Sequence, residues 1–324
     1  PSIEEGGVEK NLFNITNNLS DDFDISIITA NNDKKKFFNK KIKFISIKNN
    51  KFNKSSRFIK SLLSAMLFFK NYDRRNILIS FQSNIIAIIL SKIMFNKVIV
   101  RSNASPHIYA KNVFKRYLLR IFFNLANKII VNSNEFKNEF LKYFKLNSVV
   151  IYNPVESKSY LMKKSNKKVN FSFFKNTSSY IKILSIGRIV KQKDHLTILR
   201  AINKIKYKKK IRFCLIGKGY LENNLQYYIK KKGLNKIVKI IGYKENIYPY
   251  IVKSDLFILS SLYEGLPNTL IEARSFGIPI FSTNCKTGPK EILKKYKYGK
   301  FFKIKDHNNL SKLLMSFKPI KKKF

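Results

Sequence analysis

Short apolar runs alternate with longer amphipathic stretches along the first half of the chain. The run Asp24–Ala30 (DISIITA) is typical, because it is rich in Ile and bounded by polar residues, which favours a buried β-strand. The strands predicted in this way are 24–30, 42–47, 77–81, 98–101 and 128–131, with helices predicted at 8–19, 54–72, 84–95 and 111–127. Strands that alternate with helices predict a parallel sheet covered by helices.

The alternation resumes in the second half after an interruption. The strands predicted there are 181–186, 212–216, 238–241, 256–259 and 278–282, with helices at 194–207, 220–232 and 267–276. Residues 156–178 interrupt the pattern because they are polar, aperiodic and rich in Lys, Ser and Asn, which predicts a linker or a surface excursion. We therefore predict an α/β chain with two Rossmann-like domains, 1–155 and 156–324, the first with a truncated first strand.

Composition makes the chain strongly basic. Its 324 residues include 65 Lys plus Arg against 19 Asp plus Glu, a formal net charge of +46. Hydrophobic residues make up 44%, which excludes a disordered basic tail. The charge suits nucleic acid, an anionic membrane surface or anionic small molecules as partners. AT-rich coding would also enrich Lys and Asn, but it does not explain the excess of Lys over Glu.

The cysteines and the apolar runs favour a cytoplasmic protein. Cys214 and Cys285 lie far apart in the sequence, which is not a disulfide framework and fits a reducing compartment. The longest uncharged run, 76–91, is too short and too polar to span a membrane. Each predicted domain is long enough to bury a core of its own.

The segment 260–279 (SSLYEGLPNTLIEARSFGIP) carries the most informative pattern. An apolar strand is followed by a turn with Gly265, and then by a helix whose first-turn amides have no partner within the helix and can bind a phosphate. Those amides are predicted to be Asn268, Thr269 and Leu270. Glu264 would precede the helix, and Glu272 inside it could accept hydrogen bonds from two vicinal hydroxyls of a ribose. Taken alone, the pattern also fits a surface helix with two ordinary glutamates.

Two cations follow another predicted strand. Arg188 and Lys193 come directly after Gly187, at the carboxyl end of the strand 181–186, where open α/β sheets bind their ligands. Arg can bind a phosphate with two hydrogen bonds, and Lys can act as a point charge. In so basic a chain, two further cations are also compatible with an ordinary surface.

Glycines lie at two other strand or helix boundaries. Gly217 and Gly219 follow the strand 212–216 and precede a helix, which is a weak dinucleotide-binding pattern because the third glycine is absent. Gly6 and Gly7 precede the first helix and permit the close approach of a ligand, although a simple turn explains them equally well.

Taken together, these segments closely resemble glycosyltransferase family 4, whose members are retaining, nucleotide-sugar-dependent enzymes of the GT-B fold. The matching segments are EGLPNTLIEA, GRIVKQKD, IGKGYLENNLQ and GGVEKNLFNI, and Tyr152-Asn153-Pro154 resembles the crossover between the two domains. The Glu-x7-Glu spacing of Glu264 and Glu272 is the family's signature. The resemblance covers nearly the whole chain and implies two Rossmann-like domains that face each other across a cleft.

The resemblance also implies the roles of individual residues. Arg188 and Lys193 would bind the donor diphosphate, Glu272 the ribose, and Glu264 would face the sugar or the reacting centre. The remaining donor-site residues would be Gly187, Gly265, Asn268, Thr269 and Leu270, with Tyr243 beside the nucleobase and Gly6 and Gly7 beside the phosphates. The reaction would move a sugar from a nucleotide-sugar to a saccharide acceptor.

A histidine often lies over the donor sugar in this family, and His107 is the candidate here. Arg101 and Asn103 share its loop and are expected on the acceptor side, whereas His195 and His307 are expected to be structural or exposed. No metal and no cofactor besides the nucleotide-sugar are expected. Asp22-Phe23-Asp24 matches an Asp-x-Asp metal motif, but no partner motif accompanies it.

The helix 54–72 is basic and amphipathic, which suits an anionic membrane surface. Its apolar side comprises Phe58, Ile59, Leu62, Leu63, Met66 and Phe69, flanked by Lys54, Arg57, Lys60 and Lys70, with Arg74, Arg75 and the basic tail 318–324 beyond it. We expect peripheral attachment to the inner face of the membrane and a lipid-linked saccharide acceptor for surface polysaccharide or glycoconjugate synthesis. Packing of this helix on its own sheet is equally compatible.

Two other functions stay open at this stage. A sugar-nucleotide epimerase with a GT-B-like fold would use a similar donor site and need no acceptor. A basic nucleic-acid-binding protein would use the net charge, but the lysines are dispersed and no helix-turn-helix, zinc-ligand or aromatic RNA motif is present, so no nucleic acid is expected as a partner.

Overall fold

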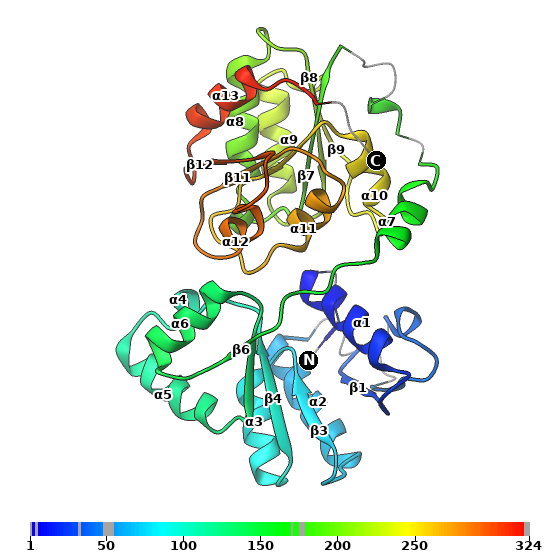
Figure 1. Cartoon of the computed structure of the whole chain (residues 1–324), viewed down its shortest axis with the longest axis vertical. Coiled ribbons are helices and arrows are strands. Elements are labelled where there is room, and N and C mark those ends of the chain that lie inside the picture. Colours follow the sequence, from blue (N-terminus) through cyan, green and yellow to red (C-terminus); the bar gives the residue numbers. More distant parts are fainter. Residues whose placement is uncertain are drawn as a thin grey trace. The chain divides into compact units, whose positions relative to one another are not determined.

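A computed structural model describes residues 2–3, 6–31, 34–47, 55–169, 171–174 and 179–320. The chain divides into two compact units, Pro1–Pro154 and Val155–Phe324 (Figure 1). The division lies one residue before the predicted boundary between 155 and 156. Glu5 of the first glycine motif, Lys54 of the basic helix and residues 321–324 of the basic tail lie outside the described residues.

The second unit contains a sheet of six parallel strands. They are β7 (Ile181–Ile186), β8 (Ile211–Ile216), β9 (Val238–Ile240), β10 (Leu256–Leu259), β11 (Ile280–Thr283) and β12 (Gly299–Phe302). Their order across the sheet is β12-β11-β10-β7-β8-β9, so the chain builds outward from β7 to β9 and then returns to the other side of β7. This reversal beside β7 is the topological switch point at which open α/β sheets bind ligands.

Apolar side chains cover both faces of this sheet. Ile183 and Leu184 are adjacent in β7, but they belong to different core clusters because successive side chains of a strand point to opposite faces. The helices that pack on the sheet are α8 (His195–Ile205), α9 (Glu222–Lys231), α10 (Tyr248–Lys253), α11 (Asn268–Ser275), α12 (Pro289–Leu293) and α13 (His307–Ser316). Burial on both faces explains why the strands are continuous apolar runs.

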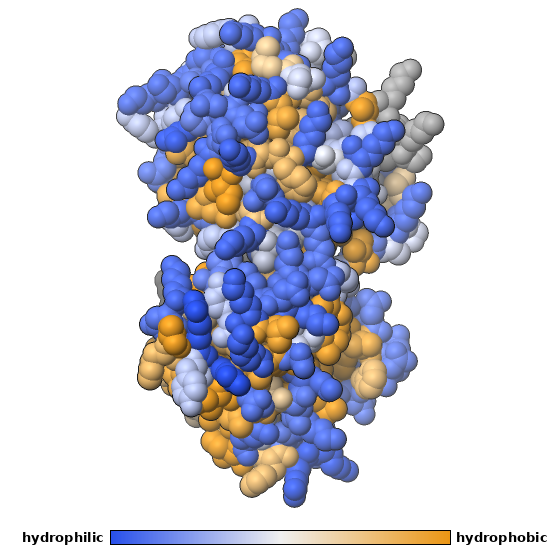
Figure 2. All heavy atoms as spheres, turned by 60° about the vertical axis from the view of Figure 1, so that its left-hand side comes forward, coloured by the Kyte–Doolittle hydropathy of each residue, from blue (hydrophilic) through white to orange (hydrophobic). Residues whose placement is uncertain are grey.

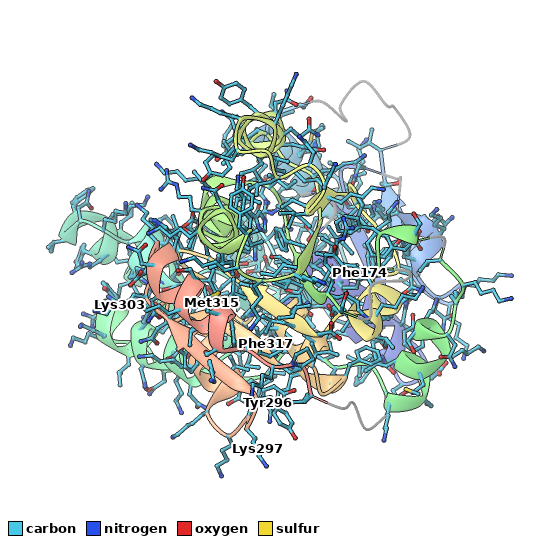
Figure 3. All side chains as sticks on the ribbon, turned by 90° about the horizontal axis from the view of Figure 1, so that it is seen from above. Phe174, Tyr296, Lys297, Lys303, Met315 and Phe317 are labelled. Atoms are coloured by element: carbon cyan, nitrogen blue, oxygen red, sulfur yellow. The ribbon has the colours of Figure 1, made fainter. Side chains whose placement is uncertain are left out.

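The chain end after α13 also joins this core. Phe317 lies 5.6 Å from Phe281 between ring centroids, with the rings nearly perpendicular. Figure 3 shows Phe317 near the strands, whereas Lys297 and Lys303 extend at the rim.

Part of the segment 156–178, predicted to be a linker or a surface excursion, is folded onto the second unit, so the alternative of a free linker does not hold there. Residues 158–174 include helix α7 (Lys158–Ser165) and the 3₁₀ helix η3 (Ser172–Phe174). Leu161, Phe171 and Phe174 are buried, and the Phe171 ring lies 5.1 Å from that of Tyr250. Three apolar anchors among many polar residues hold this segment on the core without producing a periodic pattern.

The first unit contains two smaller parallel sheets. One has the order β3-β4-β5-β6 and consists of β3 (Ile77–Ser80), β4 (Lys97–Ser102), β5 (Lys128–Val131) and β6 (Val149–Val150). The other pairs β1 (Ser26–Thr29) with β2 (Lys43–Ser46). The helices are α1 (Gly7–Leu19), α2 (Arg57–Lys70), α3 (Asn84–Ile93), α4 (Pro106–Tyr109), α5 (Val113–Asn124) and α6 (Asn134–Phe144), with the 3₁₀ helix η1 (Lys35–Phe37).

Helix α6 provides much of the first unit's core. Phe136, Phe140 and Phe144 lie four residues apart, on one face of the helix, and all are fully buried. Ser133 caps the helix, because its hydroxyl accepts a hydrogen bond from the Phe136 amide at 3.2 Å. This helix was not predicted, although its cap and the spacing of its phenylalanines were present in the sequence.

Candidate active site

Two predicted site residues meet at the switch point of the second unit. Lys193 ends the 3₁₀ helix η4 (Lys191–Lys193) after β7, and Glu264 lies in the loop after β10, the neighbouring strand. The Lys193 Nζ donates to Glu264 Oε1 at 2.5 Å, and the two side chains are only 15% and 6% exposed. A buried ion pair therefore joins the two strands whose carboxyl ends form a binding crevice in folds of this type.

Hydrogen bonds connect the two loops along their length. The Ser261 hydroxyl donates to the same Glu264 oxygen at 2.5 Å, and the Ser260 hydroxyl donates to the Lys193 carbonyl at 2.8 Å. The Leu262 amide donates to the Gln192 carbonyl at 2.8 Å. From the third loop, after β11, Thr287 Oγ1 donates to the Glu264 carbonyl. These contacts hold the carboxylate of Glu264 at a defined position.

Cys285 lies close to this ion pair in an uncharged form. Burial, reinforced by the negative charge of Glu264, raises the pKa of the Cys285 thiol to about 12. Cys214 is also buried, and burial raises the pKa of its thiol to about 12. Both cysteines are free, so neither is part of a disulfide.

Gly217 and Gly219 allow the loops after β7 and β8 to pack backbone against backbone. A Cβ atom would lie 1.9 Å from the Gly187 carbonyl oxygen at Gly217, and 2.2 Å from the Ile189 carbonyl oxygen at Gly219. The Ile189 amide donates to the Lys218 carbonyl at 2.8 Å across the same contact. The weak glycine pattern therefore has a packing role that requires no dinucleotide.

Two more predicted residues border these loops. Gly187 leaves space for the stem of Lys193, whose carbons would lie 3.4 Å from a Cβ at that position. Tyr243 follows Gly242, whose carbonyl accepts a hydrogen bond from the Gly217 amide at 2.9 Å, and its side chain is exposed. The loop after β9 is thereby held beside the loop after β8.

Helix α11 begins after Pro267 and presents its first turn next to the ion-pair loop. Asn268 and Thr269 are partly buried there. The prediction that the Leu270 amide is available to a ligand was wrong, because this amide donates to the Pro267 carbonyl at 3.0 Å and the Leu270 side chain is fully buried. The helix closes its first turn on itself at Leu270, so this amide is not a candidate for ligand binding.

Gly288 holds the turn before α11 in place. It has φ of +78°, and a Cβ there would lie 1.8 Å from the Gly265 carbonyl oxygen. Glycine is therefore required at this position both by the backbone conformation and by the close approach of the two loops.

Both glutamates of the Glu-x7-Glu pair are buried, so they are not ordinary surface glutamates. Glu264 is 6% and Glu272 is 7% exposed. Carboxylates are rarely buried to this extent unless a partner or a ligand compensates the loss of water. The arrangement supports the prediction that this segment has a special role, and it excludes the alternative of a solvated helix.

Arg188 differs from Lys193 because its side chain is exposed. Within the part of the chain that the structure describes, its guanidinium makes no hydrogen bond or ion pair. It lies one residue after Gly187 and so at the same edge of the sheet. An exposed guanidinium beside a buried ion pair is available to an anionic ligand.

His195 lies at the start of α8, beneath the Arg188–Lys193 loop, and is 4% exposed. Burial lowers the pKa of His195 to about 4, and the nearby charge of Lys193 adds to this effect. The imidazole is therefore neutral at physiological pH. His307, by contrast, is partly exposed at the start of α13.

In the first unit, His107 belongs to a polar cluster between α4 and α6. Its Nδ1 lies 3.0 Å from Glu139 Oε1 and 2.5 Å from the Ser105 hydroxyl, which also donates to the Glu139 carboxylate. The side chains of His107 and Glu139 are 23% and 15% exposed. With a carboxylate as acceptor, Nδ1 carries the proton and the other ring nitrogen, Nε2, is left for another partner. Glu139 was not identified from the sequence.

The sequence predicted Arg101 on the acceptor side, and this was wrong. The residue is only 2% exposed, so it cannot line an acceptor site. Its Nη2 donates to the Ile151 carbonyl at 3.1 Å and to Asn153 Oδ1 at 3.0 Å, and so ties β4 to the segment that resembles the domain crossover. Burial lowers the pKa of this guanidinium. Asn103 likewise donates to a backbone carbonyl, that of Phe81, at 3.0 Å.

Gly6 and Gly7 are exposed at the amino end of α1. A Cβ at Gly6 would lie 2.6 Å from Glu9 Oε2, and Glu9 accepts a hydrogen bond from Gln82 Nε2 at 2.9 Å. The glycine therefore leaves room for a carboxylate that connects α1 to the loop after β3. These two glycines, His107, Arg101 and Asn103 belong to the first unit, whereas the other predicted site residues belong to the second.

Comparisons of sequence agree with this geometry. Residues 166–323 match the family model described as Glycosyl transferases group 1. An uncharacterized glycosyltransferase of Methanocaldococcus jannaschii is 31% identical over 221 residues, which cover 63% of this chain and 54% of that protein. A Campylobacter jejuni N-acetylgalactosamine-N,N'-diacetylbacillosaminyl-diphospho-undecaprenol 4-alpha-N-acetylgalactosaminyltransferase is 24% identical over 66% of this chain and 58% of its own length. The chain thus spans little more than half the length of these relatives.

Solved structures show the same fold across both units. Alr3699/HepE of Anabaena in complex with UDP-glucose superposes with a TM-score of 0.74 at 17% identity, over 97% of this chain and 86% of that chain. The apo form of the lipopolysaccharide outer core galactosyltransferase WaaB gives a TM-score of 0.66 at 19% identity, over 95% and 85% of the two chains. The chain therefore has the GT-B fold, and its residues 166–323 match the model of the family Glycosyl transferases group 1.

Proposed function

We propose that the protein is a retaining, metal-independent glycosyltransferase that moves a sugar from a nucleotide-sugar donor to a saccharide acceptor. The observation that carries the proposal is the buried Lys193–Glu264 ion pair at the switch point, beside the exposed Arg188. A nucleoside diphosphate leaving group develops negative charge as the bond to the sugar breaks. Cations placed in advance at that position stabilise the transition state.

The donor-site roles follow from this placement. Arg188 and Lys193 bind the diphosphate, together with the amides of Asn268 and Thr269 and the turn at Gly265. Glu272 accepts hydrogen bonds from the ribose hydroxyls, and Glu264 faces the donor sugar. Tyr243 borders the nucleobase, Gly187 gives the phosphates access to the backbone, and Gly6 and Gly7 contribute from the first unit. Two side-chain cations supply the charge that a metal ion provides in other transferases, so transfer should persist in a chelator.

His107 is proposed to contact the donor sugar through Nε2. The hydrogen bond between Nδ1 and Glu139 at 3.0 Å supports this role, because it sets the tautomer and the orientation of the ring. In this proposal Glu139 is a positioning residue and does not itself touch the substrate.

The acceptor is proposed to be a lipid-linked saccharide used in surface polysaccharide or glycoconjugate synthesis. Two Campylobacter jejuni relatives are named for transfer to undecaprenol-linked saccharides, and one of them is 25% identical over 90% of this chain and 80% of its own length. An acceptor of this kind places the enzyme at the cytoplasmic face of a membrane. No helix within the described residues has the length and apolar character that crossing a bilayer requires, which is compatible with peripheral attachment.

A screen of nucleotide-sugars by titration calorimetry, followed by transfer assays with labelled donor, tests this function. UDP-sugars are the first choice, because HepE of the same fold was solved with UDP-glucose. Arg188→Ala should weaken donor binding by at least about tenfold, the loss of one charge-assisted contact. Arg200→Ala, an exposed arginine of α8, is the matched control and should bind normally. Release of an epimerised free nucleotide-sugar would instead establish an epimerase, and unchanged binding by Arg188→Ala would contradict the site.

A further inference from the structure

Three neighbouring helices of the first unit contain basic residues but no acidic ones. Helix α3 packs against both α2 and α5. The sequences of these helices, RFIKSLLSAMLFFK, NIIAIILSKI and VFKRYLLRIFFN, carry Lys or Arg at several positions and neither Asp nor Glu at any. Cationic side chains therefore lie among apolar ones across this part of the unit without compensation from the helices themselves.

Large apolar side chains of the same helices point into solvent. The most exposed ones define what we call the apolar helix face: Phe58 and Met66 of α2, Ile93 of α3, and Val113, Phe114 and Tyr117 of α5. Phe114 is 76% exposed and Phe58 is 66% exposed. In Figure 2 the lower unit shows hydrophobic patches in orange among hydrophilic blue side chains. Exposed large apolar side chains that gather on neighbouring helices mark a site of interaction.

The side of helix α2 that is buried is not the apolar side predicted from the sequence. Its buried positions are Lys60, Ser61, Ala65 and Phe68, whereas Phe58 and Met66 lie on the opposite, exposed side. The alternative in which the apolar side of this helix packs on its own sheet is thus wrong for these two residues. Apolar area left in water forgoes stabilisation, so a partner that covers these side chains gains it on binding.

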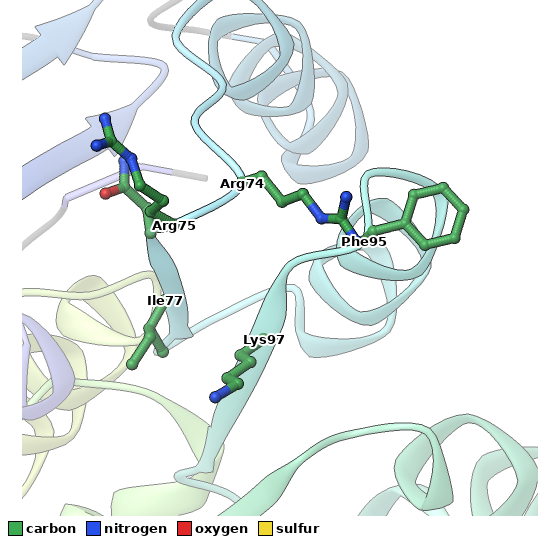
Figure 4. Close-up of a pocket in the computed structure, with 6 residues that line it drawn as sticks. Arg74, Arg75, Ile77, Phe95 and Lys97 are labelled. Atoms are coloured by element: carbon green, nitrogen blue, oxygen red, sulfur yellow. The ribbon is translucent and has the colours of Figure 1, made fainter.

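A cationic hollow lies at the end of these helices. It has a volume of about 520 Å³ and is lined by Arg74, Arg75, Asn76, Ile77, Phe95 and Lys97 (Figure 4). Arg75 is paired with Asp73 at 2.9 Å, and the Arg74 guanidinium lies 5.9 Å from the centre of the Phe95 ring. Phe95 is 76% exposed and has φ of +56°, an unfavourable conformation for a bulky residue. Exposed cations next to an exposed ring suit a phosphate headgroup attached to apolar tails.

We propose that the apolar helix face and the adjoining hollow dock on an anionic lipid bilayer. An apolar surface with an excess of cations matches such a bilayer, in which acyl chains cover the apolar side chains and anionic headgroups attract the Lys and Arg residues. A second copy of the chain is a poorer partner, because two faces with cations and no acids repel each other. The inference rests on the proposed function in that a lipid-linked acceptor requires the enzyme at a membrane.

Co-sedimentation with vesicles tests the proposal. The full chain should bind vesicles of phosphatidylcholine with 30% phosphatidylglycerol, lose binding as salt rises, and bind pure phosphatidylcholine at least tenfold more weakly. The double variant Phe114→Ser/Tyr117→Ser should bind anionic vesicles at least tenfold more weakly than the wild type. The matched control is Tyr207→Ser/Tyr227→Ser, which removes two aromatics that are 89% and 66% exposed in the second unit and should bind normally.

The outcomes separate this inference from the function. Absence of vesicle binding by the wild type, or equal binding by Phe114→Ser/Tyr117→Ser, overturns the docking surface. A concentration-dependent dimer that this variant abolishes would assign the surface to a second copy. Calorimetric binding of the nucleotide-sugar, measured without vesicles, should be equal in the wild type and both double variants. If no nucleotide-sugar binds at all, the proposed function fails while the vesicle result still stands.

Discussion

The second unit buries its apolar side chains on both faces of its sheet, whereas the first leaves many of them in solvent on three helices. In the second unit, loops from β7, β10 and β11 are joined by hydrogen bonds around one buried carboxylate. In the first unit, the polar cluster is confined to one contact between two helices. In the proposed function, the second unit binds a donor of constant chemistry and needs loops held in one geometry. The first unit would lie on the acceptor side and needs surface that a partner can cover.

The sharpest test of this contrast is Glu264→Gln in the second unit. The substitution removes the charge that holds Lys193 and that is proposed to face the donor sugar, so kcat should fall by about 10²–10³-fold. Initial rates at saturating donor measure the effect. Glu222→Gln, a partly exposed glutamate in the first turn of α9, is the control and should keep its rate. Turnover at the wild-type level in Glu264→Gln would remove the basis of the assigned site.

Gly288→Ala tests whether the loops must lie as close as the structure has them. A Cβ would lie 1.8 Å from the Gly265 carbonyl oxygen, so the turn before α11 must shift, and donor affinity should fall by roughly 10–100-fold. Gly233→Ala is the matched control, because Gly233 also has a positive φ, of +61°, but no atom lies within 4 Å of its Cβ position. It should lose only about 1 kcal/mol of stability and keep donor affinity. Equal donor affinity in both variants would refute the close packing.

Glu139→Gln transfers the test to the first unit, where we expect a smaller effect. The amide loses the charge that orients His107, and kcat should fall by about tenfold with the donor KM unchanged. Nitrogen chemical shifts of the His107 ring should show a proton on Nδ1 in the wild type and a shift of this proton toward Nε2 in the variant. Glu135→Gln, on the same helix, should alter neither. An unchanged His107 tautomer in Glu139→Gln would refute the positioning role, whatever the rate.

The smallest effect expected at neutral pH is that of His195 on the free energy of unfolding. Its pKa is lowered to about 4 in the folded protein, so between about pH 6.5 and pH 4 the unfolded chain binds a proton that the folded protein does not. The free energy of unfolding should therefore fall as the pH is lowered through this window, by up to about 3 kcal/mol. Urea unfolding across this range, compared between the wild type and His195→Gln, isolates the contribution. Parallel pH profiles would mean that His195 is not buried in the neutral form.

The strands of the second unit could be predicted because burial on both faces demands uninterrupted apolar side chains. β7 and β10 were predicted at their observed bounds for this reason. The fold around helices α7 and η3 could not be predicted in the same way. The three buried anchors there, Leu161, Phe171 and Phe174, lie among lysines and asparagines and produce neither the helical period of about 3.6 residues nor the strand period of about 2. Helix α6 was detectable from Phe136, Phe140 and Phe144, and with it Glu139 would have come within reach of His107.

Within the site, residue types and spacing predicted which residues lie together better than which contacts each of them makes. The Glu-x7-Glu pair and Lys193 lie in buried positions that a surface helix would not provide. The amide of Leu270 and the guanidinium of Arg101 were assigned wrongly, because each satisfies a backbone hydrogen bond of the fold. Which polar groups the fold already uses depends on contacts between residues distant in sequence, and these are absent from any local pattern.

The two cysteines offer a way to observe one half of the molecule alone. Cys214 and Cys285 are both fully buried, both carry thiols that burial keeps protonated, and both lie in the second unit. Reaction with a thiol reagent requires the thiolate and access to the sulfur, so it can proceed only when that unit opens. The labelling rate therefore reports how often the second unit opens. A decrease of this rate in the presence of a nucleotide-sugar would measure donor affinity without any transfer reaction.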